Sequence, residues 1–209
     1  MRRSLYRLNV PQVDLVSVAM PRPELDFPSV LQEIAAVIQS GKAKMWGAMN
    51  WTAEGLRHAW DICAAKGLPQ PVTIQIKYNV LRRNVVETEE WRRLLAETGI
   101  TLHPSDALEG GLLAGKLQPA RETGSDNGKI RPAFVERFPE FRRLAEQLGA
   151  TPAQASLALC LAHPATASVL FGASSLDQLR DNMGAIALAN RLGHPRLGEM
   201  LAPFAAAGH

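Results

Sequence analysis

KMWGAMNWTAEGLRHAWDICAAKGLPQPVTIQI, Lys44–Ile76, is the stretch that decides the fold. A short strand-like run comes first, then Thr52, which is suited to cap a helix, and a helical pattern that continues to Lys66. Gly67 is suited to end that helix, and the proline-flanked apolar run Val72–Ile76 is predicted as the next strand. Strand, helix and strand in this order predict two parallel strands joined by a crossover helix.

The same alternation extends on both sides of this stretch. Upstream, Val13–Val18 is a short apolar run, and Phe27–Gln39 carries apolar residues at helical spacing. The elements predicted downstream are a helix at Glu87–Thr98, a strand at Ile100–His103, helices at Phe138–Leu148 and Thr151–Ala162, a strand at Ser168–Phe171 and a helix from Leu176. Five strand-like segments, each followed by helix, predict an α/β fold with a parallel sheet.

Two segments lack this periodicity. Residues 118–133 are rich in Gly, Pro, Ser, Asp and Asn, which predicts a long surface loop, and residues 190–209 are interpreted as a C-terminal tail. With 46% hydrophobic and 21% charged residues, the whole chain, 1–209, is predicted to form a single domain.

Charge and cysteine content narrow the range of functions. The formal net charge is +3, but basic residues are interspersed with acids, as in Glu89–Arg93, so no nucleic-acid partner is expected. No apolar run approaches the length of a membrane span, and no apolar core follows the arginines near the start, so we expect a cytoplasmic chain with no membrane partner. Cys63 and Cys160 lack metal-ligand spacing; we predict buried free thiols and no metal site.

Five collinear segments resemble the aldo/keto reductase family. The most specific of them is Phe134–Met183, which contains FVERFPEFRRLAEQLGATPAQASLALCLAHP and SVLFGASSLDQLRDNM. The other four are SLYRLNVPQVDL (Ser4–Leu15), GKAKMWGAMNW (Gly41–Trp51), VTIQIKYNVLRR (Val72–Arg83) and ITLHPSDALEGGLLAGK (Ile100–Lys116). The resemblance covers nearly the whole chain and leaves only the tail after Asn190.

The resemblance implies an eight-stranded (β/α) barrel, of which this chain supplies strands four to eight. The expected fold is therefore a partial TIM barrel of five parallel strands alternating with helices, with the three N-terminal βα units missing. Five strands do not close such a barrel, so the edges at Val13–Val18 and Ser168–Phe171 are expected to be unpaired. We expect a second copy of the chain, as in a dimer, or a complementing chain to cover them.

The resemblance also implies kinship with NADP(H)-dependent carbonyl oxidoreductases that act on small-molecule substrates. In this family a Tyr is the general acid, and Lys, Asp and His assist it. The Tyr, Lys and Asp belong to the missing strands, and the position of the His is occupied by Ala19, in VSVAMPRP. Alanine neither donates nor accepts a proton, so the chain is not expected to be a competent reductase alone.

Many cofactor-binding positions of the family are kept. The glycines of GGLLAGK allow close approach of the backbone to phosphate, and Lys116 is suited to pair with it. The cofactor-binding residues implied by the resemblance are Asn50, Gln75, Leu108, Gly110, Gly111, Lys116, Gly172, Ser174, Gln178, Asp181 and Asn182. Two changes disfavour the cofactor: Ser105 replaces the aromatic residue that stacks on the nicotinamide, and Asp106 places a carboxylate near the pyrophosphate.

Two other functions stay open. His103, Asp106 and Lys77 form a candidate acid/base set at strand ends for a non-redox biosynthetic enzyme, such as a dehydratase, cyclase or isomerase. The other alternative is a non-catalytic nucleotide-binding or regulatory module, comparable to the family's potassium-channel β subunits. Tyr78 matches a Gln-x-x-Tyr-Asn pattern of the family and is predicted to be structural rather than a replacement acid.

Overall fold

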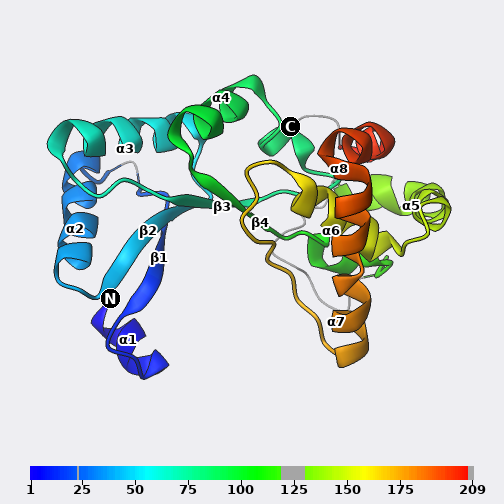
Figure 1. The fold of residues 1–209 in the computed structure, drawn as a ribbon, viewed down its shortest axis with the longest axis horizontal. Coiled ribbons are helices and arrows are strands. Elements are labelled where there is room, and N and C mark those ends of the chain that lie inside the picture. The colour runs from blue at the N-terminus through cyan, green and yellow to red at the C-terminus, as the bar shows by residue number, and fades with distance from the viewer. Residues whose placement is uncertain (23, 119–129, 207–209) are drawn as a thin grey trace. The chain divides into compact units, whose positions relative to one another are not determined.

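The computed structural model describes residues 1–22, 24–118 and 130–206. The first unit comprises Met1–Ile76 and Glu89–Leu102, and the second unit comprises Lys77–Thr88 and the residues from His103 onward. The prediction of a single domain over residues 1–209 stays a prediction, and the two compact units are described separately below. Figure 1 shows the helices and strands of each.

The elements follow one another with short connections. The first unit contains α1 (Arg2–Leu8), β1 (Val13–Ala19), α2 (Phe27–Gln39), β2 (Ala43–Met49), α3 (Ala53–Lys66) and α4 (Glu89–Thr98). The strands β3 (Thr73–Lys77) and β4 (Thr101–Ser105) begin in the first unit and end in the second. The second unit contains the 3-10 helices η1 (Arg83–Val85), η2 (Glu109–Ala114) and η3 (Ala202–Phe204) and the α-helices α5 (Ile130–Gln147), α6 (Pro152–Ala162), α7 (Leu176–Met183) and α8 (Ala185–Leu201).

One sheet holds the four strands in the order β1-β2-β3-β4. The parallel register places Ala19 opposite Met49 and Met49 opposite Gln75. The predicted α/β fold of parallel strands alternating with helices is confirmed. Because strands that are neighbours in the sheet are also consecutive in the chain, each connection is a crossover between adjacent strands.

In the first unit, large apolar side chains from β2, α2 and α3 form the core. Trp46 and Trp51 are buried together with Leu56. The Trp46 indole N–H donates to the carbonyl of Pro69 at 2.7 Å, and that of Trp51 to the carbonyl of Val18 at 2.9 Å. Both buried indole donors are therefore satisfied, and they tie the loops around the sheet to the core.

The helix α3 has the ends that its sequence predicts. The Thr52 hydroxyl accepts a hydrogen bond from the backbone N–H of Gly55 at 3.1 Å, which caps the first turn. Gly67 ends the helix with a left-handed φ of 62°, a conformation that costs glycine little. These local signals fix the crossover between β2 and β3.

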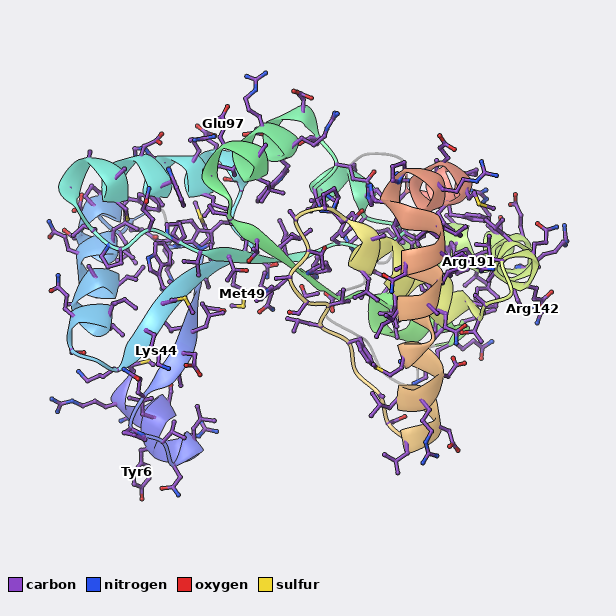
Figure 2. The ribbon with its side chains drawn as sticks, in the orientation of Figure 1. Tyr6, Lys44, Met49, Glu97, Arg142 and Arg191 are labelled. Atoms are coloured by element: carbon purple, nitrogen blue, oxygen red, sulfur yellow. The ribbon has the colours of Figure 1, made fainter. Side chains whose placement is uncertain are left out.

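The opposite face of β1 and β2 is open. Leu15 is paired with Met45, and Ala19 with Met49, so these four side chains lie on one face of the sheet. Met45 is 44% exposed, Ala19 is exposed, and Leu15 and Met49 are half-buried; Met49 and the start of β2 are labelled in Figure 2. β1 is also an edge strand, so one row of its backbone groups has no strand partner in the described sheet.

Gly47 on β2 packs directly against β3. A Cβ atom at this position would lie 2.4 Å from Thr73 Cγ2 and 2.8 Å from Thr73 O. We expect Gly47→Ala to lower the free energy of unfolding of the first unit by about 1–3 kcal/mol, because the backbone of β3 must shift to admit a methyl group. Urea unfolding followed by tryptophan fluorescence measures this, since all four tryptophans lie in the first unit: Trp46, Trp51, Trp60 and Trp91.

The control for this prediction is Ser17→Ala. Ser17 is the exposed partner of Gly47 on β1, and shortening its side chain should change the free energy of unfolding by less than about 0.5 kcal/mol. Equal effects of the two substitutions would show that a methyl group at Gly47 fits beside Thr73 without a shift of β3.

The second unit is built around α6. Residues 155–160 of this helix are all buried, as expected of a helix packed on every side. Its start is a capping box between Thr151 and Gln154. Phe134, Phe141 and Phe204 lie with ring centroids 5.2–6.5 Å apart and join α5 to η3.

The prediction of a fifth strand at Ser168–Phe171 was wrong. The backbone N–H of Leu170 donates to the carbonyl of Pro104 on β4 at 2.8 Å, but the segment is not a strand of the described sheet. Proline has no N–H to donate back, so the ladder beside β4 does not continue. The described part of the chain therefore has a sheet of four strands.

Two boundary predictions also need correction. The helix α5 begins at Ile130, so residues 130–133 are not loop; Pro132 is tolerated there because it falls in the first helical turn. The other residues of the predicted loop that follow position 118 lie outside the described residues. Within the described residues, the predicted tail from residue 190 contains the rest of α8 and then η3, with Leu197 and Leu201 fully buried. A kink at Gly193 interrupts the helical spacing that would have revealed it.

Candidate functional site

The ends of β1 and β2 carry predicted site positions of the first unit. Ala19, at the position that the resemblance assigns to the catalytic His, is the last residue of β1 and is exposed. Asn50 follows β2 with a left-handed φ of 56°, and its backbone N–H donates to the carbonyl of Gln75 at 2.8 Å. The structure thus brings the two predicted nicotinamide-end residues, Asn50 and Gln75, together.

The ends of β3 and β4 carry the candidate acid/base residues, which belong to the second unit. Lys77 Nζ lies 3.4 Å from Asp106 Oδ2, and about a third of each side chain is exposed. Burial lowers the pKa of His103, which favours its neutral imidazole. In the described part of the chain His103 forms no hydrogen bond or ion pair with Lys77 or Asp106. Two of the three predicted residues are therefore paired.

The glycine-rich segment after β4 forms a tight loop in the second unit. It begins at the half-buried Leu108, and Gly110 and Gly111 have positive φ values of 62° and 92°. Such values suit glycine and strain any other residue. Lys116 N–H donates to Gly111 O at 3.0 Å, and the aliphatic part of the Lys116 side chain covers Gly111. The loop therefore holds Lys116 at the surface, where it is exposed.

A buried ion pair anchors this loop. Glu109 is 1% exposed and has a positive φ of 47°. Arg82 donates to both of its carboxylate oxygens, through Nε at 2.9 Å and NH2 at 2.6 Å. Asn79 Nδ2 donates to Glu109 Oε2 at 2.7 Å and to the carbonyl of Asp106 at 2.8 Å. Sequence reasoning missed this cluster; its one sequence signal is an acidic residue directly before two glycines.

The predicted residues at the start of α7 are also in the second unit. Ser174 donates to Gln178 Oε1 through its N–H at 2.9 Å and its hydroxyl at 3.0 Å. Asp181 accepts a hydrogen bond at 3.0 Å from the hydroxyl that caps α6, and Asn182 is buried. Nothing lies within 4 Å of a Cβ atom placed on Gly172. Gln178 and Asp181 already have protein partners, whereas Gly172 leaves open space before a helix N-terminus that favours an anion.

Both segments lie at the end of β4. The glycine-rich loop follows Ser105, the last residue of β4. The hydrogen bond from Leu170 N–H to Pro104 O places the chain leading to Gly172 beside the same strand. The second unit therefore contains all the predicted phosphate-end residues, and the chain passes β4 just before both stretches.

A buried polar network surrounds Tyr78 in the second unit, and sequence reasoning predicted only that Tyr78 is structural. Tyr78 is fully buried, and its hydroxyl donates to Glu87 Oε1 at 2.5 Å. His194 Nε2 lies 3.1 Å from the same hydroxyl. Because the single hydroxyl proton is directed to Glu87, His194 must be the donor in this contact. Arg83 binds both oxygens of Glu87 and also donates to the carbonyl of Gly198 on α8.

The network shifts several pKa values. Burial, followed by the charge of Glu87, raises the pKa of Tyr78 far above its ordinary value, so Tyr78 stays protonated. Burial raises the pKa of Glu87, but interactions with His194, Arg83 and Tyr78 outweigh burial and lower it to about 2. Burial and the neighbouring His194 lower the pKa of His163 to about 4. His163 Nδ1 accepts the N–H of Ala165 at 3.3 Å, which agrees with a neutral ring.

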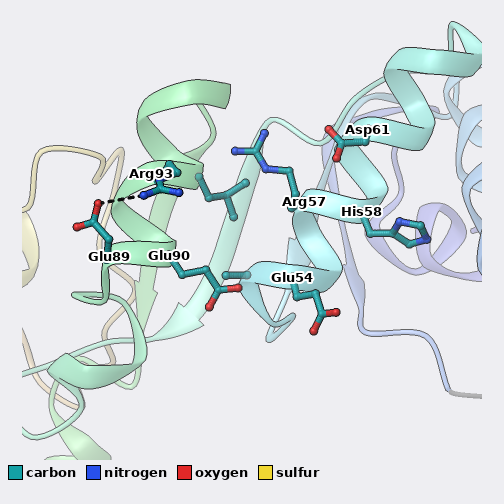
Figure 3. A pocket seen from close by; sticks show the side chains of 9 residues that line it. Glu54, Arg57, His58, Asp61, Glu89, Glu90 and Arg93 are labelled. Atoms are coloured by element: carbon teal, nitrogen blue, oxygen red, sulfur yellow. Dashed lines mark ion pairs between the residues drawn. The ribbon is translucent and has the colours of Figure 1, made fainter.

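A hollow of about 710 Å³ lies between α3 and α4 in the first unit. Figure 3 shows charged side chains from both helices around it, including Arg57 and Glu54 on α3 and Glu90 on α4. An exposed ion pair joins Glu89 to Arg93 at its rim. None of the predicted site residues lines this hollow.

Two other kinds of feature are absent from the described residues. Over residues 1–22, 24–118 and 130–206, no group of three or more His, Cys, Asp or Glu side chains is placed to hold a metal ion. Within the same ranges, no helix combines the length and the apolar character needed to cross a membrane.

The family is decided by a match along most of the sequence. Residues 1–191 match the family model described as aldo/keto reductase family. The chain belongs to the aldo/keto reductase family. The resemblance seen in the five sequence segments is thereby confirmed.

Three relatives carry the name of potassium-channel subunits. A putative voltage-gated potassium channel subunit beta of Schizosaccharomyces pombe is 30% identical over 204 residues, which are 90% of this chain and 58% of that protein. Probable voltage-gated potassium channel subunits beta of Arabidopsis thaliana and Oryza sativa subsp. japonica are 28% and 27% identical, over 88% and 89% of this chain and 60% of each relative. This aldo/keto reductase chain thus spans 58–60% of the length of these relatives.

A solved structure supports the fold. The crystal structure of a thermostable aldo-keto reductase in complex with the inhibitor epalrestat matches with a TM-score of 0.72 at 21% identity, over 96% of this chain and 63% of that one. The four parallel strands and their helices therefore correspond to a part of an aldo/keto reductase barrel. The expectation of a partial TIM-barrel fold is confirmed.

Proposed function

We propose that this aldo/keto reductase-family chain binds NADP(H) chiefly through the adenosine-phosphate end of the cofactor, in the second unit. The observation that carries the proposal is that Gly110–Lys116 closely follows β4 in the chain, while Leu170, two residues before Gly172, is hydrogen-bonded to Pro104 on the same strand. Open space at Gly172 and the exposed Lys116 suit a phosphate group, and the N-terminus of α7 favours its charge. NADPH supplies a hydride when bound.

The nicotinamide end contributes less in this proposal. Asn50 and Gln75, which the resemblance assigns to the nicotinamide end, lie together in the first unit, and the binding proposed for the second unit does not depend on them. Ser105 has no ring face to stack on the nicotinamide, which forfeits about 0.5–1.5 kcal/mol. The carboxylate of Asp106 is paired with Lys77, and this pairing reduces its repulsion of pyrophosphate.

We propose further that the chain alone is not a competent carbonyl reductase. Ala19 presents a methyl group where the resemblance expects His. The chain has two tyrosines: Tyr78 is fully buried and hydrogen-bonded to Glu87, and Tyr6 is 87% exposed on α1, where Figure 2 shows it projecting away from the ribbon. Tyr78 directly follows β3, but its buried hydroxyl already donates to Glu87, and Tyr6 lies on α1, so neither tyrosine is placed to protonate a substrate.

Titration of the purified chain with NADPH, followed by cofactor fluorescence and calorimetry, tests the binding proposal. We expect saturable binding in the micromolar range, and Lys116→Ala should weaken it about tenfold, because one charge-assisted contact to phosphate is lost. Lys66→Ala, at an exposed lysine of the first unit, is the control and should leave the affinity unchanged. No binding at millimolar NADPH would end the proposal.

A partner polypeptide and a cytoplasmic location are parts of the same proposal. The edge strand β1 and the open face at Met45 favour a covering chain, either a second copy or a complementing polypeptide. Cys63 and Cys160 are buried free thiols, as is usual in a reducing compartment.

Two alternative functions have a specific observation each. The ion pair between Lys77 and Asp106 at a strand end favours a non-redox enzyme acting on a small molecule, and a loss of turnover in Asp106→Asn without loss of NADPH binding would support it. The names of the three relatives favour a regulatory module, with or without bound nucleotide. Binding of NADPH without consumption in the presence of carbonyl compounds is the outcome expected of that module.

A further inference from the structure

The segment Tyr78–Glu87 of the second unit contacts both the glycine-rich loop and the C-terminal end of the chain. Two of its residues hold the loop. Asn79 donates to Glu109, which directly precedes the glycines, at 2.7 Å and to the carbonyl of Asp106 at 2.8 Å. Arg82 binds both carboxylate oxygens of Glu109. The position of the loop therefore depends on the position of this segment.

Other residues of Tyr78–Glu87 contact residues 194–206, which we name the C-terminal segment. Three hydrogen bonds join the two: His194 Nε2 to the Tyr78 hydroxyl at 3.1 Å, Arg83 to the carbonyl of Gly198 at 2.5 Å, and Ala206 N–H to the carbonyl of Leu81 at 3.0 Å. Along Tyr78–Glu87, the residues that hold the loop thus alternate with residues that hold the C-terminal segment. Each contact with the loop is therefore made next to a contact with the C-terminal segment.

Hydrogen bonds inside Tyr78–Glu87 make this segment stiff. The Asn79 side-chain oxygen accepts the backbone N–H of Leu81 at 2.8 Å and that of Arg82 at 3.1 Å. A continuous series of hydrogen bonds therefore runs from the C-terminal segment through Leu81 and Asn79 to Glu109. Because Leu81 and Asn79 are buried, water is not at hand to replace a lost bond.

A kink separates the C-terminal segment from the rest of α8. Gly193, directly before it, has non-helical angles of φ 69° and ψ 169°. Pro195 lies two residues further on and has no N–H to donate to the preceding turn. On the other side of the kink, Arg191, labelled in Figure 2, donates to the carbonyl of Leu148. The two parts of α8 are therefore held by different contacts.

We propose that the C-terminal segment holds the glycine-rich loop in position through Tyr78–Glu87, with His194 and Tyr78 as positioning residues. The loop and the C-terminal segment then open together as one cooperative unit. For its effect on nucleotide, this inference rests on the function proposed above. Because coupling between two sites is reciprocal, a phosphate group that orders the loop also orders the C-terminal segment.

Hydrogen–deuterium exchange of the chain without nucleotide tests the coupling. The probes are three amides that are hydrogen-bonded within the loop segment, those of Gly111, Leu113 and Lys116. If their opening also breaks the contact between His194 and Tyr78, His194→Leu should speed their exchange about tenfold, the effect of one buried hydrogen bond. His194→Gln keeps a side-chain N–H donor near the position of Nε2 and should restore most of the protection.

Arg191→Ala is the matched control. It removes a hydrogen bond of α8 before the kink, so it should destabilise the second unit without affecting a local opening of the loop. The amides of α6 report unfolding of the whole unit and should exchange faster in both variants, whereas the loop amides should respond to His194→Leu alone. Leu197, Leu201 and Phe204 still anchor the C-terminal segment in His194→Leu, so this variant should fold.

The reverse effect is measured with nucleotide at the Ala206 amide, which is bonded to Leu81. In a wild-type chain that binds NADPH, nucleotide at ten times its dissociation constant should slow exchange of this amide about tenfold, because NADPH binds only the closed loop. An unchanged rate with nucleotide bound would overturn the proposal.

The outcomes without nucleotide are equally decisive. Loop amides that do not respond to His194→Leu, or that respond equally to Arg191→Ala, would contradict the coupling. The same holds if His194→Gln exchanges as fast as His194→Leu. Absence of NADPH binding would end the function proposed above, whereas the exchange measurements on the nucleotide-free chain decide the coupling by themselves.

Discussion

Arg82→Ala is expected to lower the free energy of unfolding of the second unit by about 3–5 kcal/mol, because the variant leaves a buried carboxylate without its cation. Glu109 would keep Asn79 as a hydrogen-bond donor, but one amide does not offset a buried charge. Protection of the α6 and α8 amides in hydrogen–deuterium exchange measures this loss. Tryptophan fluorescence does not, since the second unit contains no tryptophan.

A second substitution and a control identify the cause. Adding Glu109→Gln to Arg82→Ala removes the buried carboxylate charge that has lost its arginine, and this should recover part of the lost stability. Arg142→Ala, in an exposed pair with Glu146 on α5 at 3.6 Å, should cost less than about 1 kcal/mol; Arg142 projects from α5 in Figure 2. If Arg82→Ala costs no more than Arg142→Ala, the ion pair does not stabilise the loop.

The second large effect is acid destabilisation of the second unit. His163 has its pKa lowered from 6.5 to about 4, so an unfolded chain takes up this proton at a higher pH than the folded chain. Stability from the neutral ring is complete above pH 6.5 and is lost as the pH falls to 4, by about 3 kcal/mol. The pKa of Glu87 is lowered from 4.5 to about 2, so protonation of this carboxylate between pH 4.5 and 2 should remove about 3 kcal/mol more of the stability.

Unfolding measured as a function of pH checks this prediction. His163→Asn keeps an acceptor near the position of Nδ1 but cannot be protonated, so the loss between pH 6.5 and 4 should largely disappear. His58→Asn, at an exposed position of the first unit, should leave the pH dependence of the second unit as it is. An unchanged slope in His163→Asn would contradict the assignment.

Local signals predicted most of the fold correctly. Thr52, Gly67 and Thr151 mark helix ends through contacts within three or four residues, and such contacts can be read from the sequence. The fifth strand failed for the opposite reason. Whether Ser168–Phe171 joins the sheet depends on Pro104, a residue of a distant segment that supplies no N–H.

The same distinction applies to the site. Glycines and the helix start near Gly172 were identified through motifs that are continuous in sequence. Glu109 and Arg82, 27 residues apart, and Tyr78 and His194, 116 residues apart, meet only through the tertiary fold. No periodicity or spacing indicates which of several arginines or histidines will face a given buried carboxylate.

The chain crosses between its two units after Ile76, Thr88 and Leu102, and this order matters while the protein is being made. The first unit has all its residues once Leu102 has left the ribosome, whereas the second unit needs the remaining residues up to its last helices. At the usual speed of translation the first unit waits about 5–20 s for the second. During that time its edge strand and methionine-bearing face are accessible to chaperones and to neighbouring nascent chains, so co-translational quality control should act first on the amino-terminal half.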